Sequence, residues 1–508
     1  MVAEQGQPKR ISTGIEGLDE ITDGGLPAGR WHLVRGGPGT GKTTLGLQFL
    51  AEGARSGEKT LLMTLEKPED SIRMDAESIG VDVSAIAFID LSPGPEFFTQ
   101  EGSYDIFSPA EVERSPITRR IVDAVETVEP DRVFVDTLTM FRYFMADPLQ
   151  FRRQIMSFMR FLTEGGATVV GSSEIDPTVP DADLQFLSSG VITLHSRAMQ
   201  RRGFRTVTIE KLLGSDYRGG SHAMTIRPGG MAVHARLVPE AHGKEVAPVM
   251  LSSGTPALDE ILGGGIERGS VNLLAGPTGT GKTTLGLEFM VQAAEAGERA
   301  VVYTFEEDPS TIVRRGAATG RPLTGLLERG TLSIVPMQAL TITADEFASR
   351  VRHEIERRAT RFIMIDSLAG FQLTLLGPEL VDQIYALCKY LRNMGVTAIL
   401  TREVEHIMGE FRLTEVGISY MADNIMFLRF VELDGGLRKA FGVLKKRLSA
   451  FDPTVHELTF TAEGLRIGPP MTGLRGILLG VPEPGPTRPA ARTETTEPDE
   501  TRPREPDG

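Results

Sequence analysis

The chain has 508 residues, about three times the length of a typical domain, and its 40% hydrophobic and 24% charged residues exclude collagen-like, fibrous and wholly disordered proteins. Its 54 Lys and Arg against 68 Asp and Glu give a net charge of −14, so we expect no nucleic acid as partner. The single cysteine, Cys388, excludes an intrachain disulfide and a zinc finger, and the absence of a signal peptide or a long apolar run predicts a cytoplasmic protein with no membrane partner.

The predicted elements occur twice along the chain. Residues 11–50 align without a gap on residues 251–290, and 21 of the 40 positions are identical. The offset of 240 residues is far longer than a solenoid repeat, so each copy is a whole domain. We predict a first domain over 1–240, a second over 241–470, and a flexible, Pro-rich C-terminal tail over 471–508.

Each copy alternates short, β-branched apolar runs with amphipathic helical stretches, which predicts an α/β fold with a mostly parallel sheet. We expect buried strands at 31–36, 59–66, 131–138 and 167–174, and again at 271–276, 299–307, 361–368 and 397–404. The segments 203–213 and 439–448 alternate in polarity and predict antiparallel strands that close each domain. Ligands of such sheets bind at the carboxyl ends of the strands.

Both copies contain the pattern G-x-x-x-x-G-K-[ST] between a predicted strand and a predicted helix. Its glycines allow backbone N–H groups to surround phosphates, its lysine reaches the β and γ oxygens, and its threonine hydroxyl faces Mg²⁺. The alternative, a glycine-rich turn with an incidental lysine, does not explain two copies. The candidate nucleotide-binding residues are Gly36, Gly39, Thr40, Gly41, Lys42, Thr43 and Thr44, and Gly276, Gly279, Thr280, Gly281, Lys282, Thr283 and Thr284.

Carboxylates follow the neighbouring strands. Asp136 and Asp366 each end an apolar strand, as Walker B aspartates do, and we expect them to hold Mg²⁺ with Thr43 and Thr283; a helix N-cap is the alternative role. Glu66 follows the run LLMTL, and Glu306 and Glu307 follow the run VVYTF, at the ends of the strands expected at 59–66 and 299–307. We expect these glutamates to orient the attacking nucleophile, unless Glu306 and Glu307 are merely solvated loop residues.

The doubled P-loop domain, the GLDE motif near its start, the TFEE strand end and a late K-x-R strand together resemble the KaiC family of circadian-clock ATPases and autokinases. The resemblance extends to about residue 470 and implies tandem RecA-like domains, ATP and Mg²⁺ as cofactors, and a homohexamer. It also implies an ATPase ring of first domains, an autophosphorylating serine/threonine kinase ring of second domains, and regulators similar to KaiA or KaiB, or a signalling kinase, as partners.

In the second domain, the resemblance gives Glu306 and Glu307 catalytic roles and adds Glu306 to the Mg²⁺ ligands. It gives Lys445 and Arg447 the K-x-R role of reaching the neighbouring subunit's nucleotide, and alternate strand residues do share a face. The alternative for this pair is a basic edge strand, because Lys446 lies between them. Ser419 matches a phosphoacceptor serine.

Three positions depart from the family pattern. Tyr420 replaces the threonine that follows the acceptor serine. The first domain keeps Glu66 and Lys211, but Lys67 replaces the second glutamate and Leu213 replaces the second cation of K-x-R. We therefore expect nucleotide binding in the first domain, with hydrolysis weakened by the lost cation.

The sequence leaves three candidate functions for this protein. The first is an ATP-dependent hexameric ATPase and autokinase with a timing or signalling role. The second is a nucleotide-gated hexameric scaffold with slow hydrolysis and no phosphotransfer. The third, a DNA-dependent RecA-like motor, is disfavoured by the acidic balance and by the lack of a recognised basic or aromatic platform.

Overall fold

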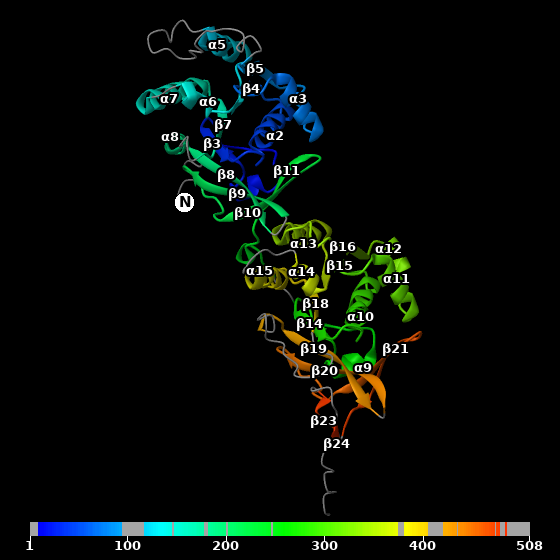
Figure 1. Cartoon of the computed structure of the whole chain (residues 1–508). Helices are drawn as coiled ribbons and strands as arrows, with labels where there is room; N and C mark the ends of the chain where they lie inside the picture. The colour runs from blue at the N-terminus through cyan, green and yellow to red at the C-terminus, as the bar shows by residue number, and fades with distance from the viewer. Residues whose placement is uncertain are drawn as a thin grey trace, which may run out of the picture. The chain divides into compact units, whose positions relative to one another are not determined.

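The computed structural model describes residues 9–93, 116–144, 147–176, 181–199, 202–244, 247–373, 380–404, 420–433, 435–472, 474–477 and 483–484. The chain divides into two compact units, of which the first contains Met1–Val238 and the second nearly all residues from Pro239 onward. Figure 1 shows a sheet flanked by helices in each unit. The predicted C-terminal tail lies almost wholly outside the described residues.

The first unit contains a nine-stranded sheet in the order β11-β10-β9-β8-β3-β7-β6-β4-β5. The strands from β8 to β5 in this order are parallel, and β9, β10 and β11 continue the sheet in antiparallel pairs. The bounds are β3 (Trp31–Gly36), β4 (Thr60–Thr64), β5 (Ala87–Asp90), β6 (Arg132–Asp136), β7 (Thr168–Glu174), β8 (Gly190–Met199), β9 (Arg202–Leu212), β10 (Ser221–Arg227) and β11 (Gly230–His234).

The sheet of the second unit repeats this plan in the order β16-β15-β17-β18-β14-β19-β20-β21-β22. The strands from β16 to β19 are parallel and the last three are antiparallel. The bounds are β14 (Val271–Gly276), β15 (Ala300–Thr304), β16 (Leu332–Pro336), β17 (Phe362–Asp366), β18 (Thr397–Glu403), β19 (Asn424–Leu433), β20 (Gly436–Lys446), β21 (His456–Thr461) and β22 (Gly464–Pro470).

Two-stranded ribbons complete the sheet structure. They pair β1 (Arg10–Ile11) with β2 (Leu26–Pro27), β12 (Met250–Leu251) with β13 (Ile266–Glu267), and β23 (Leu474–Arg475) with β24 (Glu483–Pro484).

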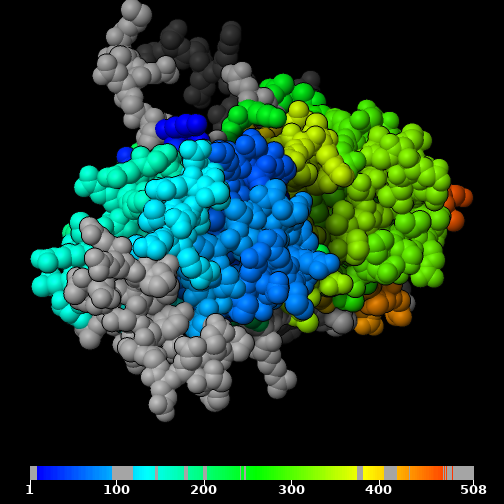
Figure 2. All heavy atoms as spheres, turned by 90° about the horizontal axis from the view of Figure 1, so that it is seen from above, coloured from blue at the N-terminus to red at the C-terminus, as the bar shows by residue number. Residues whose placement is uncertain are grey.

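Helices cover both faces of the two sheets. In the first half of the chain they are α1 (Leu18–Ile21), α2 (Lys42–Arg55), α3 (Glu69–Ser78), α5 (Pro116–Val128), α6 (Met140–Phe144), α7 (Pro148–Glu164) and α8 (Ala182–Leu187). In the second half they are α9 (Pro256–Ile261), α10 (Lys282–Glu295), α11 (Pro309–Ala318), α12 (Thr324–Glu328), α13 (Ala344–Arg358), α14 (Leu368–Gln372) and α15 (Leu380–Asn393), preceded by the 3₁₀ turn η1 (Pro239–Ala241). In Figure 2, atoms of α3 (blue) and of α5 (cyan) are both exposed on the visible side of the first unit.

The cores follow from the apolar strands. Strands β4, β14, β15 and β17 are buried along their whole length, which requires helices on both faces. In the first unit one core layer lies under α1, α2 and α3, and a second lies under α5, α7 and α8. The predicted α/β fold class with antiparallel closing strands is therefore confirmed.

Two further observations complete the description of the fold. Cys388 lies on α15 and is buried, which raises the pKa of its thiol to about 12. It is therefore a thiol of the core. Within the described part of the chain, no helix has the length and apolarity needed to cross a membrane.

Candidate nucleotide sites

Each P-loop connects the central strand of its sheet to a long helix. The residue before the helix, Gly41 or Gly281, has a φ of 106° or 104°, a left-handed conformation that favours glycine. A side chain there would also collide with the core, because a Cβ at Gly281 would lie 2.2 Å from a ring carbon of Phe460. Glycine at this position thus turns the helix N-terminus toward the loop, where its N–H groups face an anion.

Each P-loop lysine folds back onto its own loop. Lys42 Nζ donates to the carbonyl of Gly36 at 2.9 Å, and Lys282 Nζ donates to the carbonyl of Pro277 at 2.9 Å. Burial lowers the pKa of both lysines, and nearby carboxylates oppose the shift. These carbonyls are neutral partners, so phosphate oxygens can replace them at little electrostatic cost.

The predicted metal residues meet in both copies. Thr43 Oγ1 donates to Asp136 at 2.8 Å, and Thr283 Oγ1 donates to Asp366 at 2.8 Å. Burial raises the pKa of Asp366, and Thr283 is one of two hydroxyl donors that oppose the rise. Asp366 is not a helix N-cap, because Ser367 caps α14.

This donor set fits magnesium. Hydroxyl and carboxylate oxygens are the ligands that Mg²⁺ takes, together with phosphates and water, usually through one or two carboxylates. Among the described residues, there is no cluster of three or more His, Cys, Asp or Glu that could hold a metal.

The second unit has an open pocket of about 380 Å³ around its P-loop. P-loop residues, carboxylates, two cations and an aromatic ring line it: Thr278, Gly279, Gly281, Lys282, Thr283, Thr284, Glu306, Glu307, Arg315, Thr319, Asp366, Ser367, Glu403, Lys439 and Phe460. The predicted P-loop lysine, Walker B aspartate and paired glutamates therefore come together in one cavity.

The glutamates that follow β15 have different partners. Ser367 Oγ donates to Glu306, while Arg315 on α11 donates to Glu307 at 2.6 Å. In the first unit, partial burial and the charges of Glu174 and Asp136 raise the pKa of the corresponding Glu66. Lys67 pairs with Asp75 of α3 at 3.1 Å.

Lys445 and Arg447 lie together in the second unit. Lys445 Nζ donates to the carbonyl of Ala422 at 2.7 Å, and Arg447 Nη2 donates to the carbonyl of Tyr420 at 2.6 Å. Lys446 between them is fully buried and binds the carbonyls of Leu262 and Gly265 on the other side. The buried side chain of Lys446 does not fit an exposed basic strand, although β20 pairs with β21 only at Ala440 and Phe441.

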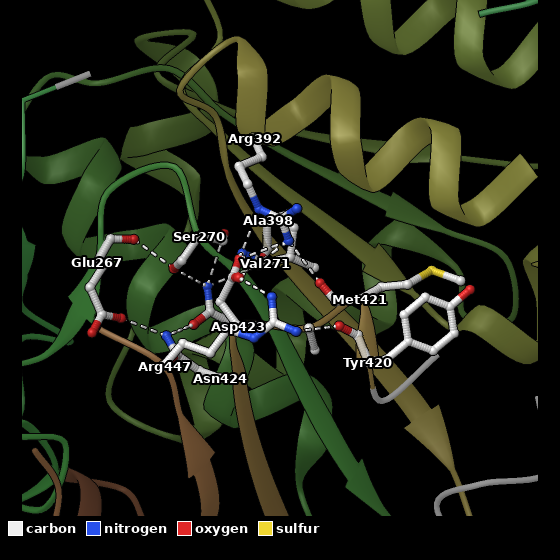
Figure 3. Close-up of polar contacts among 12 residues, drawn as sticks. Glu267, Ser270, Val271, Arg392, Ala398, Tyr420, Met421, Asp423, Asn424 and Arg447 are labelled. Atoms are coloured by element: carbon white, nitrogen blue, oxygen red, sulfur yellow. Dashed lines mark hydrogen bonds and ion pairs between the residues drawn. The ribbon is translucent and has the colours of Figure 1, made fainter. Parts of the chain in front are cut away.

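The carboxylate of Asp423 connects this pair to the sheet (Figure 3). It is buried, accepts a hydrogen bond from Val271 N at 2.9 Å and pairs with Arg392 at 3.1 Å. Arg447 Nη1 lies 3.6 Å from it. Asp423 thus anchors the end of β20 that carries the two cations.

The matching corner of the first unit keeps one cation. Lys211 Nζ donates to the carbonyls of Gln185 and Phe186 at 3.2 and 3.1 Å. Leu213 is half-exposed and offers no charge. Strand pairing shifts register beside both lysines, between Val191 and Ile192 in the first unit and at the corresponding place beside Lys445 in the second. Such a register shift is a β-bulge, which changes the direction of the neighbouring side chains.

Two glutamates at the P-loops were not predicted. β7 and β18 lie beside the P-loop strands, and Glu174 and Glu403 at their ends pair in register with Gly36 and Gly276. Their position at the end of a predicted strand, like that of Asp366, was the available signal. Ser419 and residues 405–418 lie outside the described residues.

Known proteins share this organisation. A sequence profile of the KaiC ATPases matches residues 11–238 and again 251–472. The chain belongs to the KaiC family. It is 28% identical over 485 residues to the circadian clock protein KaiC3 of Synechocystis, covering 93% of this chain and 94% of that protein. It is 30% identical over 490 residues to the circadian clock oscillator protein KaiC of Parasynechococcus marenigrum, covering 94% of each.

Membership of the KaiC family agrees with the geometry above. Each matched segment contains one complete P-loop and its threonine–aspartate pair. A family of ATPases uses nucleotide and, as a rule, a divalent metal, for which both copies have the necessary donor groups.

Proposed function

We propose that this KaiC-family chain is a cytoplasmic, Mg²⁺-dependent ATPase that assembles as a homohexamer. We propose further that its second domain phosphorylates itself on serine, as part of a timing or signalling role. The supporting observation is the pocket in which Lys282, Thr283, Asp366 and the paired glutamates Glu306 and Glu307 converge. The P-loop supplies phosphate binding, and the carboxylates supply metal and nucleophile binding.

Thr283, Asp366 and Glu306 would hold Mg²⁺ in the second domain, and Thr43 and Asp136 would hold it in the first. Bound there, Mg²⁺ supplies charge neutralisation for the phosphate oxygens. The hydrogen bond between Thr283 and Asp366 supports this assignment, because it already brings a hydroxyl and a carboxylate oxygen together at 2.8 Å.

The protein's own groups perform the remaining work. Lys282 leaves the carbonyl of Pro277 and binds the β and γ oxygens of ATP. Glu307, or Glu306, accepts the proton of the attacking hydroxyl as that oxygen bonds to the γ-phosphorus. The bond from the γ-phosphorus to the bridging oxygen breaks, and its electron pair remains on ADP.

Lys445 and Arg447 are proposed to act on the nucleotide of a neighbouring subunit. In their own chain they bind carbonyls of Ala422 and Tyr420, whereas other residues line the pocket around Lys282. A cation that completes a neighbour's site links ATP binding to assembly, since a ligand that binds only the assembled state stabilises it.

The first domain is proposed to bind ATP and to hydrolyse it slowly. Its P-loop and the pair Thr43–Asp136 match the second copy. Leu213 cannot stabilise transition-state charge, an effect worth ~10³-fold or more where an arginine has that role. The first ring would thus contribute mainly to assembly.

A nucleotide-gated scaffold is the second candidate function. Lys67, Leu213 and Tyr420 favour it, because each departure removes a group that phosphate chemistry uses. The output of such a scaffold would be partner binding, with regulators similar to KaiA or KaiB, or with a signalling kinase. A DNA-dependent motor has less support, since the net charge of −14 opposes binding to a polyanion.

Incubation with γ-labelled ATP and Mg²⁺, followed by phosphopeptide mapping, tests the kinase assignment. We expect label on Ser419, and we expect the double variant Glu306→Gln/Glu307→Gln to lose it. Tyr420 is the internal control and should stay unlabelled, because its phenol oxygen lies about 4 Å farther out than a serine hydroxyl would, too far for attack at ~3 Å. An ATP-loaded hexamer without phosphate in residues 408–425 would favour the scaffold.

A further inference from the structure

The two copies contain the same ion pair with the charges exchanged. In the second unit Glu307 follows β15 and binds Arg315 of α11, with Arg315 Nη2 2.6 Å from Glu307 Oε1. In the first unit Lys67 follows β4 and binds Asp75 of α3, with Lys67 Nζ 3.1 Å from Asp75 Oδ2. At the repeat offset of 240 residues, Lys67 corresponds to Glu307 and Asp75 corresponds to Arg315.

The backbone around the pair is the same in both copies. Thr304 Oγ1 donates to the carbonyl of Glu307 at 2.8 Å, and Thr64 Oγ1 donates to the carbonyl of Lys67 at 2.5 Å. The first backbone N–H after β15 donates to the carbonyl of the Walker B residue Asp366 at 2.7 Å. The first N–H after β4 donates to the carbonyl of the corresponding Asp136 at 2.8 Å. The loop is therefore fixed by the backbone, and the ion pair determines where the side chain of residue 67 or 307 lies.

The pair in the second unit faces the nucleotide pocket. Both Glu307 and Arg315 line that pocket together with Lys282, and each side chain is only about 30% exposed (31% and 29%). Asp308 caps α11 by accepting a hydrogen bond from Ser310 N at 2.8 Å, so the helix that carries Arg315 starts directly after Glu307.

The two oxygens of Glu307 differ. Oε1 accepts the hydrogen bond from Arg315, whereas Oε2 is buried and accepts none from the residues that the structure describes. A buried acceptor without a donor costs free energy, so such a group in a folded protein indicates a water, an ion or a catalytic role at that atom. The corresponding group in the first unit is an ammonium, which has no acceptor oxygen.

We propose that Arg315 is a positioning residue for the phosphoryl transfer of the second domain. By holding Oε1 of Glu307 against α11, it presents Oε2 to the hydroxyl of the attacking nucleophile, whose proton Glu307 takes as the phosphorus–oxygen bond forms. In the first domain the exchanged pair Lys67–Asp75 keeps the loop in place and lacks this acceptor. The inference rests on the proposed ATP chemistry at Lys282 and adds the residue that orients its base.

Single-turnover transfer from γ-labelled ATP in the full-length chain, together with the affinity for a fluorescent ATP analogue, tests the inference. Arg315→Leu should lower the transfer rate by about 10²-fold, the effect of a misplaced catalytic group, with analogue affinity unchanged. Arg315→Lys should recover most of the rate, because lysine restores a donor. Arg314→Leu, the same change at the exposed neighbouring residue of α11, should match the wild type.

The exchanged variant Glu307→Lys/Arg315→Asp separates positioning from stability. It rebuilds the pair of the first domain, so thermal stability should stay near that of the wild type while the rate falls as far as in Glu307→Gln. A wild-type rate in Arg315→Leu or in the exchanged variant would overturn the inference, as would equal losses of rate and affinity. If Lys282→Ala leaves the wild-type rate intact, the proposed function itself fails.

Discussion

His32 should make the stability of the first domain depend on pH. It lies in β3, the strand that leads into the first P-loop, and it is fully buried. Its Nε2 lies 3.0 Å from the carbonyl of Pro27, and its buried Nδ1 has no hydrogen-bond partner among the described residues. Burial lowers the pKa of His32 from 6.5 to about 4.

The direction of the effect follows from proton binding. Below pH 6.5 the unfolded chain binds a proton at His32, whereas the folded chain binds it only near pH 4. The contribution of neutral His32 to the free energy of unfolding is therefore fully present above pH 6.5, and it is lost as the pH decreases to about 4. At 1.36 kcal/mol per pH unit, the whole window corresponds to roughly 3 kcal/mol.

His32→Asn is the matched perturbation, because the second copy has Asn272 at this position. That residue is buried and donates to the carbonyl of Ala398 at 3.1 Å, so asparagine suits the site. Denaturant unfolding of the full-length protein should be followed from pH 7.5 to pH 4.5. Relative to that of the wild type, the unfolding free energy of the variant should increase by about 1.4 kcal/mol for each pH unit below 6.5.

Subtracting the unfolding free energy of the wild type from that of the variant at each pH removes the contribution of carboxylates that titrate in both proteins. Parallel curves of unfolding free energy against pH would refute the reasoning, since they would show that His32 binds its proton equally in the folded and unfolded chains.

Three further predictions concern assembly and turnover. Lys42→Ala should reduce hexamer formation in light scattering more than phosphate release, and Lys282→Ala should abolish most release; the reverse pattern would contradict the division between domains. Asp423→Asn should lower the unfolding free energy by about 1–3 kcal/mol and slow release, because Arg447 loses its nearby carboxylate; release at the wild-type rate would exclude an anchoring role. Chelation of Mg²⁺ should return ATP-loaded hexamers to smaller species, and a light-scattering mass that does not change would contradict the linkage.

The sequence predicts those parts of the fold that depend on local pattern. The strands at 31–36 and 271–276 have the predicted bounds, because short continuous apolar runs between turn residues are typical of strands buried on both faces of a parallel sheet. The contacts Thr43–Asp136 and Thr283–Asp366 follow from topology, since carboxyl ends of neighbouring parallel strands meet at one edge.

The sequence could not reveal contacts that depend on side-chain direction. The sequence predicts that Lys445 and Arg447 share a face, but it does not show that Lys446 between them binds backbone carbonyls on the other side. Asp423 and Arg315 were not singled out, because a lone charged residue in an alternating segment usually faces solvent. Only the packed structure shows that each one anchors a proposed catalytic side chain.

The comparison of the two copies suggests why one chain would keep two nucleotide sites of unequal chemistry. Nucleotide binding depends on backbone N–H groups, a lysine and a threonine–aspartate pair, and these are the same in both units. Phosphoryl transfer depends in addition on charges at the edge of the site, and there residue 67 differs in sign from residue 307. Since binding alone suffices to link a nucleotide to assembly, a first domain without transfer groups would still stabilise the proposed hexamer. The proposed autokinase role of the second domain brings a base and a hydroxyl to one phosphorus atom and therefore requires those groups.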